Sequence, residues 1–280
     1  MSKNYYCLVA GLREYSLESE SKGFDAPAIV AEIREELSGK DSEYLELFYG
    51  FYDIENIVSM IAGRTHFSPL GNYTREQLEQ EIKKPEALPK YIREILAAYA
   101  EPEDDEYSEV DVSKAIEKSL FGAYYRECGK RKCRFIREWY EFDRNLRNVI
   151  AAFAARRMGI PVAETTVGDG YVVDVLSRSS AADFGLKGEL DYLDQVMAAT
   201  AEQSNLIEKE RRVDIIRWEM AEELTAVEYF NLNKILGYLA KVNIVYRWVA
   251  LDPQAGREMF QRLLASLGGE EPIRQKTENK

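Results

Sequence analysis

The sequence contains a single histidine, His66, and only three cysteines among its 280 residues. One histidine cannot supply a multi-histidine metal site, and its isolation argues against catalysis that depends on histidine. Cys128 and Cys133 are too far apart in sequence for the two-residue spacing of a zinc-ligand pair, and no second pair exists. An odd number of cysteines is typical of a chain in a reducing compartment. We therefore expect no metal, no cofactor and a cytoplasmic location.

Long hydrophobic runs are also missing. The uncharged stretch at 148–155 is far shorter than the ~20 apolar residues that span a bilayer. The apolar residues at 5–12 are followed at once by Arg13 and Glu14, without the small-residue pattern of a signal-peptide cleavage site. We therefore expect no transmembrane helix and no secretory signal.

Basic residues are in the minority, because 37 lysines and arginines stand against 49 acidic residues, for a net charge of -12. Phosphate backbones and anionic lipids repel such a surface, so we expect no nucleic-acid partner. No Walker motif is present, and the kinase-like tripeptide at 183–185 lacks the other kinase motifs. With 46% hydrophobic and 31% charged residues, the composition is that of a globular protein with a sizeable core.

What the sequence does contain is a pattern that occurs twice, at residues 53–64 and 145–156. Each copy begins with an acidic or amide residue, has asparagine three positions later, and ends with alanine and arginine at matching offsets. A weaker third copy starts at Phe230 and keeps only Asn233 and Lys241. The three asparagines lie 92 and 85 positions apart. This spacing predicts three similar portions, each about the size of a small helical bundle.

On a helix, the polar positions of each copy lie beside an apolar stripe. These positions are our candidate site residues: Asp53, Asn56, Arg64, Asn145, Asn148, Arg156, Asn233 and Lys241. An amide at the border of a buried stripe is expected to bond the backbone of a neighbouring helix or loop, since burying it unpaired costs roughly 1–3 kcal/mol. We interpret the pattern as a helix-packing motif. The alternative is an exposed stripe that binds a partner.

Helix signals recur along the chain and predict an all-α fold. Asp25 is suited to cap one helix, and Thr74 and Gln77 have the spacing of a capping box. The least helical region, at 161–175, has β-branched residues around two glycines, which leaves a short β-hairpin open there.

The same signals divide the chain into portions. The expected order is a first helical bundle at 1–100, an acidic linker at 101–111, a second bundle at 112–200, a third bundle at 201–267 and a flexible tail at 268–280. The linker is assigned from its acidic residues, whose mutual repulsion favours an extended chain. The bundles are expected to pack together, because a bundle of this size cannot bury its apolar faces alone.

Two function classes follow from the residues alone. A generic helical adaptor would bind peptides or helices in an apolar groove between bundles. A carboxylate-dependent small-molecule enzyme would need a deep pocket with shifted carboxylates near Asp214, Glu219 or Glu222. We rank the enzyme last, because a solvated helix face explains the neighbouring acids as well.

The repeated helix resembles the repeated element of the C-type connector of V-type and archaeal-type ATPases, whose eukaryotic counterpart is the d-type connector. The likeness rests on the D/N-x-x-N-hydrophobic-hydrophobic-x-x-hydrophobic-Ala-x-Arg pattern at 53–64 and 142–157, and it extends to 228–248. The aromatic residues at 4–12 are also similar to the start of that family. The third copy is degraded and the chain is short for the family, as in a divergent bacterial relative.

The resemblance implies three pseudo-repeated helical bundles that form a funnel-like or elongated array. It implies a non-catalytic connector on the central stalk, which couples the soluble rotor shaft to the membrane rotor ring for proton or other ion transport. The implied partners are the shaft and ring subunits, and the implied location is cytoplasmic, peripheral to the membrane through the complex. In that role, the polar positions of the first two copies pack the repeats together.

Overall fold

The computed structural model describes residues 4–16, 24–100, 109–201 and 205–250. Within these ranges the chain forms helices and turns without any strand, which confirms the predicted all-α fold. No helix of these ranges is long and apolar enough to cross a membrane. The helices are α1 (Tyr6–Gly11), α2 (Ala26–Glu36), α3 (Lys40–Ile61), α4 (Arg75–Lys83), α5 (Lys90–Ala100), α6 (Glu109–Gly129), α7 (Arg134–Met158), α8 (Val162–Thr165), α9 (Tyr171–Arg178), α10 (Leu193–Ala201), α11 (Leu206–Thr225) and α12 (Leu232–Ala250).

Two helices begin where the sequence predicted. The Asp25 carboxylate accepts a hydrogen bond from the Ala28 N–H at the start of α2 (3.0 Å). At the start of α4, the Thr74 hydroxyl accepts from the Gln77 N–H, and the Gln77 side chain accepts from the Thr74 N–H. Both caps satisfy backbone donors that the first turn of a helix leaves free.

The β-hairpin considered for 161–175 is absent, and that expectation was wrong. The region contains α8 and most of α9 instead. Val172, Val175 and Leu176 recur at helical spacing and pack on the core, so their burial favours a helix over an alternating strand. Gly168 has a positive φ of 81° and lies in the turn between the two helices without starting a hairpin.

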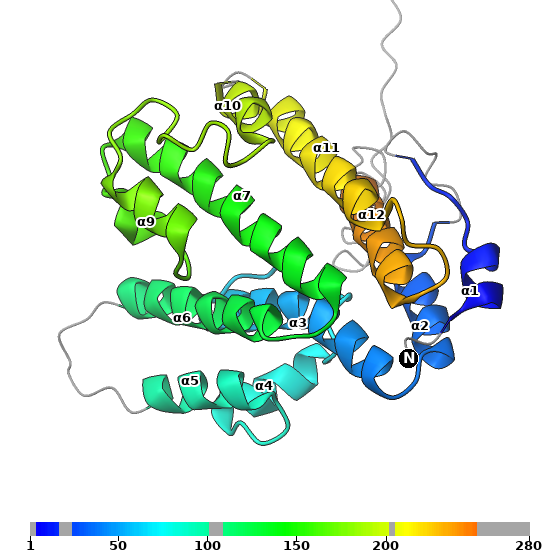
Figure 1. Ribbon diagram of the computed structural model, residues 1–280. Helices are drawn as coiled ribbons and strands as arrows, with labels where there is room; N and C mark the ends of the chain where they lie inside the picture. The colour runs from blue at the N-terminus through cyan, green and yellow to red at the C-terminus, as the bar shows by residue number, and fades with distance from the viewer. Residues whose placement is uncertain (1–3, 17–23, 101–108, 202–204, 251–280) are drawn as a thin grey trace, which may run out of the picture.

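Five long helices, α3, α6, α7, α11 and α12, determine the architecture. In Figure 1, α3 and α7 diverge from one end of the molecule, and α11 is joined to α12 by a short turn near that end. There the Asn233 Oδ1 accepts a hydrogen bond from the Phe135 N–H (3.3 Å), which links the first turns of α12 and α7. The rings of Phe48 and Phe135 lie 6.3 Å apart and link α3 to α7. α6 packs against both α3 and α7.

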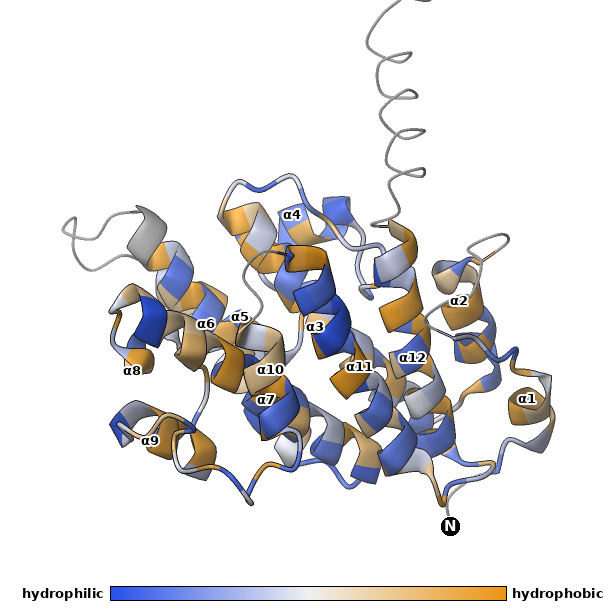
Figure 2. Cartoon of the chain, turned by 90° about the horizontal axis from the view of Figure 1, so that it is seen from above, coloured by the Kyte–Doolittle hydropathy of each residue, from blue (hydrophilic) through white to orange (hydrophobic). Residues whose placement is uncertain are grey.

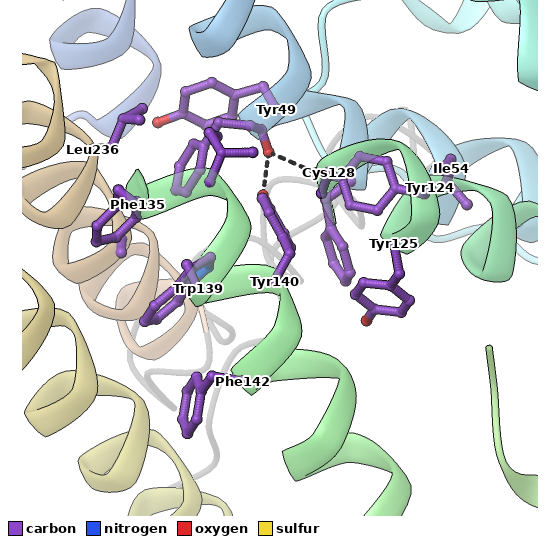
Figure 3. Close-up of a cluster of buried hydrophobic side chains, with 14 of the residues drawn as sticks. Tyr49, Ile54, Tyr124, Tyr125, Cys128, Phe135, Trp139, Tyr140, Phe142 and Leu236 are labelled. Carbon is purple, nitrogen blue, oxygen red and sulfur yellow. Dashed lines mark hydrogen bonds between the residues drawn. The ribbon is translucent and has the colours of Figure 1, made fainter. Parts of the chain in front are cut away.

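A single hydrophobic cluster runs through all of these helices and contains residues from each of the three expected portions. Its aromatic centre, drawn in Figure 3, includes Tyr124 and Tyr140. The Tyr124 hydroxyl donates to the Leu47 carbonyl (2.8 Å), and the Tyr140 hydroxyl donates to the Phe48 carbonyl (2.5 Å). Figure 2 shows polar and apolar residues along the same helices, as expected for amphipathic helices that share one core.

The expected portions therefore pack as one body around this core. α6 begins at Glu109, inside the acidic linker expected at 101–111. Residues 101–108 lie outside the described residues, as do 251–267 of the expected third bundle and the whole expected tail at 268–280.

α11 and α12 approach each other closely at Gly237. A Cβ added there would lie 2.4 Å from the Thr225 Cγ2, and Thr225 is held in place because its hydroxyl donates to the Ala221 carbonyl (2.8 Å). We expect Gly237→Ala to lower the free energy of unfolding by about 1–3 kcal/mol through overpacking. Gly122→Ala is the matched control, since its Cβ would have no neighbour nearer than 3.6 Å. Urea denaturation of both variants measures the difference, and equal stabilities would contradict the close approach.

Candidate functional site

The asparagine of the first copy, Asn56, lies on α3 and bonds the segment that follows this helix. Its Nδ2 donates to the Ser68 carbonyl (2.9 Å), and its Oδ1 accepts from the Ser68 N–H (2.7 Å). One turn earlier, the Asp53 Oδ1 accepts from the N–H groups of Asn72 (2.7 Å) and Tyr73 (3.2 Å). These bonds pair buried and partly buried backbone groups and hold the segment against α3.

The second copy repeats this arrangement on α7. The Asn148 Nδ2 donates to the Val167 carbonyl (2.9 Å), and its Oδ1 accepts from the Val167 N–H (2.8 Å). The bonded backbone lies 19 residues after Asn148, against 12 residues after Asn56. The two segments therefore differ in length although the amide makes the same pair of bonds. Asn145, which replaces Asp53, is also buried, and it accepts one long bond from Arg144 (3.5 Å).

The basic positions of the two copies differ in what they contact. The Arg64 side chain is exposed. Arg156 donates to the carbonyls of Ser179 and Ala181, and its guanidinium carbon lies 3.4 Å from the ring centroid of Phe184. Phe184 is fully buried with a φ of 58°, an uncommon conformation for a residue with a side chain. Arg156 thus holds a strained segment after α9, a role that Arg64 does not share.

In the third copy, the matching positions serve other contacts. Asn233 caps the first turn of α7 through the Phe135 N–H and donates to the Glu228 Oε1 (3.0 Å). The Lys241 Nζ lies 3.2 Å from the Glu222 Oε1, and 4.9 Å from the ring centroid of Trp218. Asn233 therefore joins two portions of the chain and does not hold the segment that follows its own helix.

A cavity of about 770 Å³ lies between the long helices, and α3, α7, α11 and α12 all contribute side chains to its wall. Side chains of α3 and α7 that are 92 residues apart, the offset between the first two copies, face the cavity in pairs. These pairs are Phe48 with Tyr140, Phe51 with Asp143, and Glu55 with Arg147. The repeat thus presents the same face of α3 and α7 to the cavity, next to the face that carries the asparagines.

Two buried carboxylates, Asp143 and Asp214, organise the charges of the cavity wall. The Arg147 Nε lies 2.8 Å from the Asp143 Oδ2, and the Tyr125 hydroxyl donates to the same oxygen (3.1 Å). Arg217 joins the two carboxylates, because its Nε lies 3.4 Å from the Asp143 Oδ1 and its Nη1 lies 2.9 Å from the Asp214 Oδ1. Burial raises the pKa of Asp143, but the two arginines outweigh it and hold that pKa below its usual value.

The chain of charges continues onto α12. The Arg247 Nη1 lies 2.9 Å from the Asp214 Oδ2, and the Trp248 Nε1 donates to the same oxygen (3.0 Å). Arg247 also pairs with Glu210. This charge network therefore ties α7, α11 and α12 together along one side of the cavity. Removing Arg217 would take one of two arginine partners from each buried aspartate, so we expect it to destabilise the packing of these helices.

Sequence reasoning missed this charge network, although a signal for it was present. Asp143 and Arg147 are four residues apart, Asp214 and Arg217 are three apart, and each pair stands among apolar helix positions. Oppositely charged residues at these spacings meet on a helix surface. Only the structure shows that the two pairs share Arg217 across the cavity wall.

The carboxylates proposed for an enzyme lie in different surroundings. Asp214 lines the cavity within the charge network, whereas Glu219 and Glu222 do not line it. The cavity carboxyl whose pKa is raised by burial is Glu55, on α3. Among the described residues, no three histidine, cysteine, aspartate or glutamate side chains gather in a way that could hold a metal ion.

The amide bond of Asn148 can be tested by substitution. Asn148→Leu leaves the partly buried N–H and carbonyl of Val167 without their amide partner, so we expect it to lower the free energy of unfolding by about 1–3 kcal/mol. Asn148→Asp keeps the acceptor for the Val167 N–H but loses the donor to the Val167 carbonyl. Its loss in unfolding free energy should therefore be no larger than that of Asn148→Leu. Thermal and urea unfolding measure the stability of both variants. Unchanged stability together with lost partner binding would instead mean that the residue faces a partner.

Asp53 should make stability depend on pH. Burial raises the pKa of this carboxyl from 3.8 to about 6, although hydrogen bonds from Asn72 and Tyr73 oppose the rise. Between these values the folded protein holds a proton that the unfolded chain has released, so stability falls as the pH rises through this window. The loss is roughly 3 kcal/mol and is complete above the folded-state pKa.

Asp53→Asn removes this titration and inserts the residue found at Asn145 in the second copy. We expect the unfolding free energy of the variant, minus that of the wild type, to increase by roughly 3 kcal/mol between about pH 4 and pH 7. Urea titrations at unit pH intervals measure this difference. A difference that is constant with pH would show that Asp53 ionises normally in the folded protein.

Comparison with known proteins identifies a family for the chain and nothing finer. No curated protein and no solved structure matches the chain. One family model matches residues 1–271, and it is described as a protein of unknown function, DUF2764. Because this match covers nearly the whole sequence, the chain belongs to the DUF2764 family.

Proposed function

We propose that the chain is a non-catalytic connector of a V-type rotary ATPase or ATP synthase, placed between the soluble rotor shaft and the membrane rotor ring. The observation that carries the proposal is the cavity whose wall is built from α3, α7, α11 and α12, so that all three portions of the chain contribute to it. The resemblance of the repeated helix to the C-type connector of these motors supplies the partner class.

A connector that transmits torque must resist deformation while two other proteins pull on it. Two features of the chain would supply this stiffness. The amides of Asn56 and Asn148 each hold a following segment by two hydrogen bonds, and the charge network ties α7, α11 and α12. Hydrogen bonds within such networks are worth most where water is excluded, and Asp143 and Asp214 are nearly fully buried.

A second candidate function, a helical adaptor, is favoured by one surface. Val227 and Tyr229, in the turn between α11 and α12, are each 69% exposed. Beside them, the rings of Tyr6 and Phe230 lie 4.8 Å apart and both side chains are exposed. Exposed apolar side chains that gather in one place often mark a protein interface.

The proposal is tested by affinity purification of the full chain from a lysate of its own source, followed by mass spectrometry. We expect shaft and ring subunits of a V-type motor to be recovered together, at low salt and at roughly 0.15 M salt. A tagged, unrelated helical protein of similar charge serves as the control bait. Failure to recover any motor subunit at either salt concentration would count against the connector.

The same purification distinguishes the adaptor. If other proteins are recovered, Tyr229→Ser should reduce their recovery, because it removes an exposed aromatic ring from the apolar surface. Tyr171→Ser is the matched control, since Tyr171 is 62% exposed but lies on α9. Equal recovery with both variants would exclude that surface as the binding site.

A further inference from the structure

The α3 side of the cavity carries polar groups that no described residue satisfies. Glu55 and Tyr52 both line the cavity and are half-buried. Within the described part of the chain, neither the Glu55 carboxylate nor the Tyr52 hydroxyl has a hydrogen-bonding partner. Burial raises the pKa of Glu55 although the positive charge of Arg147 opposes the rise, so the charged form of Glu55 lacks full compensation from the protein. A half-buried carboxylate of this kind gains from a cation that reaches it.

The arginines of the cavity are already engaged by other acids. Arg147 pairs with Asp143, and Arg217 bridges Asp143 and Asp214. Arg247 pairs with Asp214 and Glu210 in the same charge network. Moving Arg147 to Glu55 would leave the buried Asp143 with only the longer contact from Arg217 (3.4 Å), which is unfavourable.

The aromatic side chains of the wall suit a cation. Phe48, Phe51, Tyr52, Trp139 and Tyr140 all line the cavity. One of them already holds a guanidinium, because the Arg147 Cζ lies 4.7 Å from the ring centroid of Phe51. Aromatic faces attract ammonium and guanidinium groups, most strongly where water is excluded. The volume of about 770 Å³ is in the range of pockets for small organic molecules.

From this geometry, we propose that the cavity binds a small organic cation, whose ammonium or guanidinium group pairs with Glu55 and packs against the aromatic wall beside Tyr52. The net charge of -12 favours the approach of such a ligand and disfavours an anion. Lys209 also lines the cavity, from α11, and it would repel a ligand cation placed near it. This binding proposal does not depend on the proposed rotary function, so a test that contradicts one of them leaves the other unaffected.

The test is isothermal titration calorimetry of the full chain with 1,4-diaminobutane, spermidine and agmatine, with 1,4-butanediol as the neutral probe. We expect saturable binding of at least one cation, one per chain, and none of the diol. Glu55→Gln should weaken binding by about tenfold or more, since it replaces a charged hydrogen bond with a neutral one. Glu79→Gln makes the same charge change at an exposed position of α4 and should leave the affinity unchanged.

Two further variants keep the result interpretable if Glu55→Gln unfolds the protein. Tyr52→Phe removes only the hydroxyl and should weaken binding severalfold, while circular dichroism verifies that the helices are intact. In the Lys209→Met variant, the affinity for the cations should be equal or higher. If the cavity instead bound an anion or a zwitterion, this variant would bind it less well. No saturable binding below about 10 mM would overturn the proposal. Equal losses in the Glu55 and Glu79 variants would also overturn it, because they would indicate diffuse attraction to an acidic surface.

Discussion

The pairing of two buried carboxylates with three arginines is the interaction on which the arrangement of the long helices depends. Asp143 and Asp214 come from different helices, and both contact Arg217. Because a buried charge is tolerated only with its partner, α7, α11 and α12 can pack only in the register that completes these pairs. The charges thus favour one register of these helices, and they place polar groups in a cavity wall that is otherwise mostly apolar.

The repeat uses two neighbouring faces of one helix for two purposes. Asn56 and Asn148 lie on the face that binds the segment after each helix, whereas Glu55 and Arg147 lie on the face that lines the cavity. The two copies share the first purpose and differ in the second, since an acid in one copy stands where the other has a base. An internal repeat can therefore keep a shared scaffold while its inner surface becomes asymmetric.

The all-α fold and the helix starts could be predicted from local signals, because caps and helical periodicity depend on a few neighbouring residues. Asn56 and Asn148 could also be singled out, since an amide beside an apolar stripe needs a partner. What could not be predicted is which backbone each amide meets, as Val167 and Ser68 lie at different separations from it. The hairpin expectation failed because tertiary burial of Leu176 overrode local β preference. The contact of Arg217 with Asp143 spans 74 residues and leaves no local signal.

Glu55 differs from the other carboxylates of the cavity wall in the partners that the described residues offer to its charge. Folding places charges of both signs on the same wall, yet it satisfies Asp143 and Asp214 and leaves Glu55 without a hydrogen bond among the described residues. A wall selected only for stability would gain little from such a residue, since partial burial disfavours its charge even though its carboxylate is not fully enclosed. A half-buried acid beside unsatisfied Tyr52 is therefore better explained by something that enters the cavity than by packing alone.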